Sequence, residues 1–160
     1  MKKLIFSLFV AVLVLTVGVL AHEFEVECSN LAVSKNTEGF LEGVHDIDAW
    51  IKECEFDLPG SVNFLLGEGN ILVSISMNSG EIENFYASIA DKKVSGLVEG
   101  VPEDEDYNYQ VLLGEDTFNA LLNSNDVAAL GLEGIENGDI VLKGNSLWNK
   151  FKLFFGKMFI

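Results

Sequence analysis

Arginine is missing from this chain of 160 residues, and its 10 lysines are outnumbered by 25 aspartates and glutamates. The resulting formal net charge of −15 argues against nucleic acid as a partner, because phosphate binding needs clustered cations. Charged residues make up 22% and hydrophobic residues 49% of the chain, which argues against intrinsic disorder. The length favours one compact domain.

Cysteine and histidine are equally scarce, with two residues of each. Two cysteines are too few for a disulfide scaffold or a four-ligand zinc site. His22 and His45 could bind copper only if they met in space, so we interpret both as surface residues. The four carboxylates of residues 103–106 lack the central glycine of a calcium loop and are interpreted as a solvated loop. We therefore expect neither a metal site nor a cofactor.

Catalytic patterns are also lacking. No serine lies in a Gly-x-Ser-x-Gly elbow, and neither histidine has a serine or cysteine at motif spacing. Carboxylates are plentiful enough to keep a carboxylate hydrolase as a distant alternative. No tryptophan and arginine pattern for substrate binding accompanies them. The sequence therefore predicts a protein that is not an enzyme.

The N-terminus has the pattern of an export segment. Lys2 and Lys3 precede an apolar run over residues 4–21, and a polar stretch begins at His22. This pattern is typical of a signal peptide cut after Ala21. The run is also about long enough for an uncleaved membrane anchor. Either alternative places a single domain of residues 22–160 outside the cytoplasm, secreted or anchored.

Apolar spacing predicts a strand and then a helix at the start of that domain. Residues 23–28 alternate, with Phe24, Val26 and Cys28 on one face. Residues 38–55 have helical spacing, and one apolar stripe contains Phe40, Val44, Ile47, Ile51 and Cys54. Cys28 and Cys54 thus both point inward, which allows a disulfide. Two separate buried thiols are the alternative, because geometry decides between them.

The middle of the chain changes to a period of two. Between residues 61 and 113 the pattern predicts an antiparallel meander, with turns near residues 78–80 and 91–93. The inward side chains of one strand are expected to be Ile71, Val73, Ile75 and Met77, with Ser74 and Ser76 on the opposite face.

Helices return in the last third. Asp116 is the expected N-cap of a helix that carries Phe118, Leu121 and Leu122, and Asp126 is the expected cap of a second helix. A short strand over 140–142 follows, and residues 146–159 form an amphipathic helix with a broad aromatic face. The whole is an α+β fold, with an antiparallel meander of about five strands covered by helices.

Two stretches carry a resemblance to a known family. YQVLLGEDTFNALLNSNDVAALGLEGIENGDIVLKGNSLWNKFKLFF, from Tyr109 to Phe155, resembles the second half of sterol carrier protein type lipid-binding domains. GNILVSISMNSGEIENFYASIADKKVSGLVEG resembles the sheet of that family. The resemblance covers roughly residues 38–160. It implies helices and a sheet around an apolar cavity that takes a lipid, without chemistry, and a final helix that borders the cavity.

The resemblance leads to a functional hypothesis. We expect an exported domain that binds a lipid or another hydrophobic small molecule, with the C-terminal helix closing the cavity or resting on a membrane surface. A cell-envelope structural or interaction module with a packed core and no ligand is the alternative. The expected ligand-binding residues are apolar and come from both halves of the domain: Met77, Phe85, Phe118, Leu122, Trp148, Phe151, Phe155 and Met158.

Overall fold

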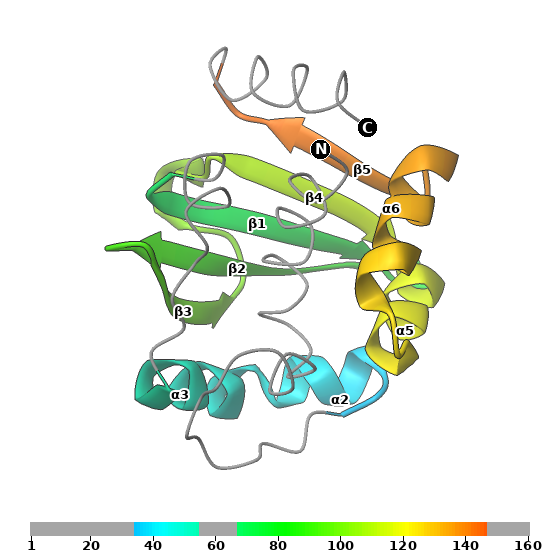
Figure 1. The fold of residues 1–160 in the computed structure, drawn as a ribbon, viewed down its shortest axis with the longest axis horizontal. Helices are drawn as coiled ribbons and strands as arrows, with labels where there is room; N and C mark the ends of the chain where they lie inside the picture. The colour runs from blue at the N-terminus through cyan, green and yellow to red at the C-terminus, as the bar shows by residue number, and fades with distance from the viewer. Residues whose placement is uncertain (1–33, 55–66, 147–160) are drawn as a thin grey trace.

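The computed structural model describes residues 34–54 and 67–146. These residues form a five-stranded sheet with helices packed against it (Figure 1). In chain order the elements are α2 (Thr37–Glu42), α3 (Val44–Cys54), β1 (Gly69–Ser76), β2 (Ile82–Ala90), β3 (Lys93–Glu99), the 3₁₀ turn η2 (Glu103–Glu105), β4 (Tyr109–Gly114), α5 (Glu115–Asn123), α6 (Val127–Asn137) and β5 (Ile140–Gly144).

The sheet is mixed, which corrects the expectation of a purely antiparallel meander. Its strand order is β3-β2-β1-β4-β5, and only the central pair, β1 with β4, is parallel. The chain forms a meander through β1, β2 and β3. It then crosses to the other side of β1 before entering β4. The α+β class and the strand count agree with the sequence prediction.

The two faces of the sheet differ in character, as the period of two predicts. Ile71, Val73 and Ile75 belong to one buried apolar cluster under the helices, and Met77 packs against it. We call this the inner face. Ser74 is buried on the opposite, outer face, where its hydroxyl donates to Asn84 Oδ1 at 2.7 Å.

The predicted first helix is two helices, because the chain turns at Gly43 between α2 and α3. Its apolar stripe nevertheless continues through both helices: Phe40, Val44, Ile47, Ile51 and Cys54 are all buried. The sequence pattern therefore gave the correct buried face and missed the one-residue break.

The helix caps test two further predictions. Asp126 caps α6 as expected, since its side chain accepts the N–H of Ala129 at 2.9 Å. The N-cap of α5 is Gly114 rather than Asp116. Asp116 instead accepts the amide of Asn78 at 3.1 Å from within the first turn, where a carboxylate also complements the helix dipole.

The helices lie over the inner face and around its edges. Figure 1 shows α3 beside β3, and α5 and α6 where β1, β4 and β5 meet the helical layer. In α6, a Cβ on Gly134 would lie 2.6 Å from Ile140 Cδ1, so glycine is what lets this helix approach β5 closely. Across residues 34–54 and 67–146, no helix is long and apolar enough to cross a membrane.

Several predictions fall on residues outside the described ranges. They are the export segment of residues 1–21, the strand of residues 23–28 with Cys28, the alternation at 61–66 and the C-terminal helix of residues 146–159 beyond Ser146. The pairing of Cys28 with Cys54 therefore stays a prediction.

Candidate functional site

The candidate site is the apolar layer between the inner face of the sheet and the helices. Every described strand and helix α2, α3, α5 and α6 contributes a buried side chain to it. The strands supply mainly branched aliphatic residues, while α2, β2 and α5 each supply one phenylalanine. Such a layer can stabilise an apolar guest by the same burial that stabilises the fold, at roughly 25 cal/mol per Å² removed from water.

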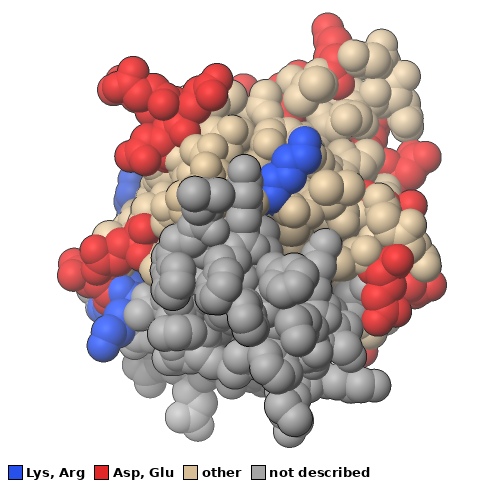
Figure 2. All heavy atoms as spheres, turned by 90° about the horizontal axis from the view of Figure 1, so that it is seen from above, with Lys and Arg blue, Asp and Glu red and all other residues tan. Residues whose placement is uncertain are grey.

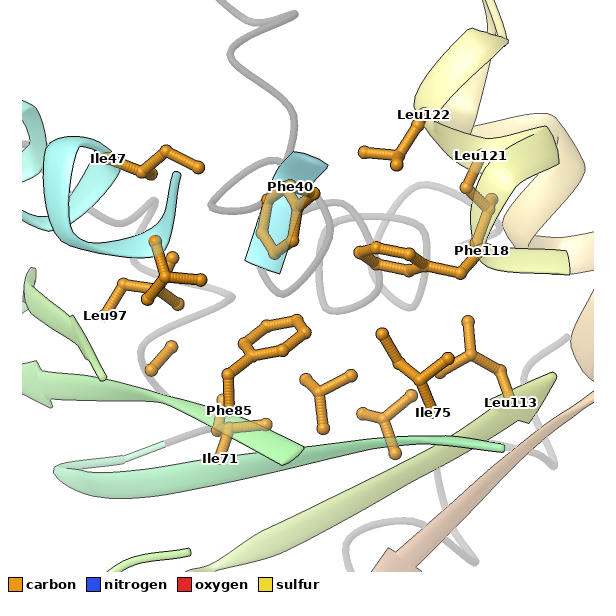
Figure 3. Packing of buried hydrophobic residues seen from close by; sticks show 14 of the residues in the cluster. Phe40, Ile47, Ile71, Ile75, Phe85, Leu97, Leu113, Phe118, Leu121 and Leu122 are labelled. Carbon is orange, nitrogen blue, oxygen red and sulfur yellow. The ribbon is translucent and has the colours of Figure 1, made fainter. Parts of the chain in front are cut away.

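Three phenylalanine rings form the centre of this layer (Figure 3). The Phe40 centroid lies 5.3 Å from that of Phe85 and 5.2 Å from that of Phe118, and Phe85 and Phe118 are 6.0 Å apart. The rings meet at tilted and edge-on angles, which suits their electrostatics. We call these residues the phenylalanine triad; none of its members is more than 1% exposed.

Four of the eight predicted ligand-binding residues lie in the described ranges, and the fold brings them together. Phe85 from β2 and Phe118 and Leu122 from α5 belong to the apolar cluster. Met77, just after β1, packs against the cluster and is only partly buried. The other four, Trp148, Phe151, Phe155 and Met158, lie outside the described residues.

Polar contacts hold α2 against α5 beside the triad. The Asn119 side-chain oxygen accepts both the backbone N–H of Thr37, at 2.8 Å, and its hydroxyl, at 3.0 Å. One turn later, Asn123 donates its amide to the carbonyl of Lys35 at 2.7 Å. We call these contacts the α2–α5 clasp. They join Thr37, which begins α2, and Lys35, which precedes the helix, to the second half of α5. Thr37 is fully buried there.

The other end of α5 is fixed to the sheet. The Asn78 backbone N–H donates to Glu115 at 2.8 Å, and its side-chain amide donates to Asp116. These contacts tie the β1–β2 turn to the first turn of the helix. Helix α5 is therefore held at both ends, by the hairpin at one and by α2 at the other.

Tyr109 is the polar member of the inner layer. It opens β4 and is 4% exposed. Burial raises the pKa of its hydroxyl to about 12, because the neutral phenol is favoured where water is excluded. Within the described ranges, no three His, Cys, Asp or Glu side chains group so that they could hold a metal ion.

The outer face carries uncharged polar side chains in cross-strand contact. Ser74 lies between Asn84, to which it donates, and Gln110, which donates to Ser74 Oγ at 3.1 Å. Ser88 donates to Asn70 Oδ1 at 2.8 Å. Figure 2 shows aspartate and glutamate in groups around the rim of the visible surface, with uncharged side chains and a lysine between the upper groups.

Sequence reasoning missed two parts of this site. Phe40 was correctly placed on an apolar stripe, but nothing in the pattern put it against Phe85 and Phe118. The second part is the polar clasp of Asn119 and Asn123. Asn119 lies within a predicted helix, and Asn123 begins the polar stretch that is predicted to end it; asparagine is common at helix ends and in turns without any distant partner. Contacts over 82 and 88 residues leave no local signal.

Comparisons with known proteins add a set of similar structures. No protein-family model matches the chain, and no curated protein matches it either. Sterol carrier protein 2 from Yarrowia lipolytica, in its apo form, is 17% identical, with 74% of this chain and 96% of that one covered and a TM-score of 0.46.

Two further solved structures are similar at lower scores. Palmitated SCP2L2 from Aedes aegypti is 17% identical, with 56% of this chain and 73% of that one covered and a TM-score of 0.38. The UbiJ-SCP2 ubiquinone synthesis protein is 9% identical, with 64% and 82% covered and a TM-score of 0.37. Structures of the sterol carrier protein type are thus among those to which this chain is similar, as the sequence resemblance predicts.

Proposed function

We propose that this protein binds a lipid or another hydrophobic small molecule, without chemistry, in the apolar layer between the sheet and helices α2 and α5. One observation carries the proposal. The sequence predicts four described ligand-binding residues, Met77, Phe85, Phe118 and Leu122, and all four lie in or against one apolar cluster. They come from three separate elements or their ends.

The energetics favour an acyl chain or a compound of similar polarity. Each CH₂ group moved from water into such a layer contributes about 0.8 kcal/mol, so a medium-length chain gains enough to offset the rearrangement of a few side chains. The partly buried Met77 lies at the border of the cluster. Its unbranched, polarizable side chain adapts to guests of different shape.

The wider setting of the proposal comes from the sequence. Residues 1–21 are proposed to direct export, and the domain of residues 22–160 is proposed to act outside the cytoplasm. Residues 147–160 are proposed to close over the ligand or to rest on a membrane surface. Residues 1–21 and 147–160 lie outside the described residues, and the apolar and basic patterns of these two segments support the proposed roles.

A binding titration tests the proposal. Purified protein is stripped of bound lipid and titrated with cis-parinaric acid, a fluorescent fatty acid, while native mass spectrometry of untreated material detects co-purified lipid. We expect saturable binding with one ligand per chain. A folded protein that neither carries lipid nor takes up the probe would contradict the proposal.

Matched substitutions locate the site. Met77→Asn places a polar amide against the cluster, whereas Leu112→Asn makes the same kind of change at a half-buried position on β4, where the side chain belongs to the outer face. We expect Met77→Asn to weaken binding roughly tenfold, as the loss of about 1.4 kcal/mol of apolar contact implies. The Leu112 variant should bind like the unaltered protein. The opposite ranking would move the site to the outer face.

A second candidate function is favoured by the triad itself. The centroids of its rings are 5.2–6.0 Å apart, and the rings fill the centre of the layer. A packed core of this kind is expected of an interaction module that binds no ligand. The same titration separates the two candidates. A stable fold without any uptake of the probe supports the interaction module.

A further inference from the structure

Phe40 occupies the middle of the layer in which a ligand is proposed to bind. Its ring is fully buried, and its centroid lies 5.3 Å from that of Phe85 and 5.2 Å from that of Phe118. The centroids of Phe85 and Phe118 are slightly farther apart, at 6.0 Å, so the three rings are in mutual contact. A guest that reaches the centre of the cluster must therefore displace at least one of the three rings. Which ring moves depends on how firmly each backbone is held.

Phe85 and Phe118 are carried by well-fixed elements. Strand β2 is paired on both sides, with β1 and with β3. Helix α5 is tied to the β1–β2 turn at its first turn, where Asn78 contacts Glu115 and Asp116. Moving either ring by a backbone shift would break strand pairing or these contacts.

Phe40 is carried by the shortest of the three elements that hold the triad, since β2 and α5 have nine residues each. Helix α2 has six residues, far fewer than the roughly 12–15 that an isolated helix needs to be even marginally stable. Its C-terminal end meets α3 at the single residue Gly43, whose N–H donates to the carbonyls of Gly39 and Phe40. Its N-terminal end is held by the α2–α5 clasp. Short elements with few attachments open at low free energy.

We propose that Phe40 is an internal plug that fills the ligand site of the empty protein, and that α2 swings about Gly43 to withdraw it when the α2–α5 clasp opens. This inference rests on the proposed function and adds the determinant of access. Asn119 acts through the position of α2 and is a positioning residue. Phe40 sets how easily the centre of the layer becomes vacant.

Stopped-flow binding of cis-parinaric acid tests the role of the clasp. If α2 must open first, the observed association rate levels off at high probe concentration, at the opening rate. Asn119→Ala removes the acceptor of both Thr37 donors, and the plateau should rise about tenfold, which corresponds to ~1.4 kcal/mol. Asn119→Asp retains a side-chain oxygen at the same place and should restore the slow plateau.

The matched control is Asn84→Ala. It deletes a part-buried side-chain hydrogen bond of 2.7 Å on the outer face, remote from α2. Its plateau should equal that of the unaltered protein. If Asn119→Ala leaves the plateau unchanged, or if Asn84→Ala raises it equally, the clasp does not control access and the inference is wrong.

Equilibrium binding by Phe40→Leu tests the plug itself. A smaller side chain is displaced at lower cost, so the dissociation constant should fall several-fold. A weaker affinity would show that the Phe40 ring contacts the bound ligand and does not have to be displaced by it, which would contradict the proposed role of Phe40. If the unaltered protein binds the probe but the variants do not show the expected changes in association rate and dissociation constant, the further inference is wrong and the proposed function still stands. If neither the unaltered protein nor any variant binds, the proposed function itself has failed.

Discussion

Asp48 joins helix α3 to the edge strand β3 and offers a test of what holds this helix in place. Its Oδ1 accepts the backbone N–H of Leu97 at 2.9 Å, and its Oδ2 lies 2.7 Å from the Lys52 ammonium nitrogen. The Asp48 side chain is 14% exposed, while that of Lys52 is 58% exposed. We predict that Asp48→Ala lowers the free energy of unfolding much more than Lys52→Ala does.

The two interactions differ in kind, and this sets the magnitudes. A hydrogen bond to a charged group contributes about 1.5–3 kcal/mol, and removing Asp48 takes the acceptor from a part-buried N–H. An exposed ion pair four residues apart on a helix contributes about 0.3–0.5 kcal/mol. We therefore expect a loss of about 2 kcal/mol for Asp48→Ala and of less than about 0.5 kcal/mol for Lys52→Ala.

Urea unfolding followed by far-ultraviolet circular dichroism measures both losses. Asp48→Asn is the matched control, because it retains a side-chain oxygen for Leu97 and removes the ion pair; its loss should fall between the other two. Gly96→Ala supplies an independent check, since its Cβ would lie 3.0 Å from Asp48 Oδ1 and should weaken the same contact. Equal losses for Asp48→Ala and Lys52→Ala would refute the reasoning.

Three further predictions concern a tyrosine, a glycine and the two cysteines. Burial raises the pKa of Tyr109 from 10.0 to about 12, so the unfolded chain loses the phenol proton at lower pH than the folded chain does. The free energy of unfolding should therefore fall as pH rises from about 10 to about 12. Urea unfolding at a series of pH values measures this fall, and Tyr109→Phe should remove the part that comes from Tyr109. Gly138 caps α6 at φ 82°, and Gly138→Ala should cost about 1–2 kcal/mol in the same assay, with a smaller loss for Gly138→Asn. If Cys28 and Cys54 are paired, thiol titration of the protein unfolded without reductant finds no free thiol, and reduction should lower its stability by about 2–4 kcal/mol.

The sheet shows why some of the fold could be predicted from sequence and some could not. The alternation of Val73, Ile75 and Met77 with Ser74 and Ser76 identifies a strand and its buried face, because side chains alternate between faces with a period of two. That alternation is the same in parallel and antiparallel strands. The parallel pairing of β1 with β4 follows from the path of residues 100–108 across the sheet, which hydrophobic pattern does not report.

For the candidate site too, the sequence predicts which side chains are buried and does not predict which of them meet. Phe85 and Phe118 could be found because each lies on the apolar face of a well-patterned element. Phe40 lies on such a face as well, yet its meeting with them depends on how α2 is placed against α5. That placement is set by Asn119, whose contact with Thr37 spans 82 residues. Polar contacts between distant elements are specified by the assembled fold and have no local period.

The hydrogen bonds that hold α5 to the β1–β2 hairpin and to α2 bear on the proposed function. Glu115 and Asp116 fix the first turn of this helix to the β1–β2 hairpin, and Asn119 presents its oxygen to α2 one turn later. The helix therefore serves as a fixed frame to which α2 is attached by side chains rather than by a continuous backbone. Hydrogen bonds between side chains and a helix start can break without any loss of sheet pairing. A fold built this way can release Phe40 from the centre of its core while the strands that carry the rest of the site stay in register.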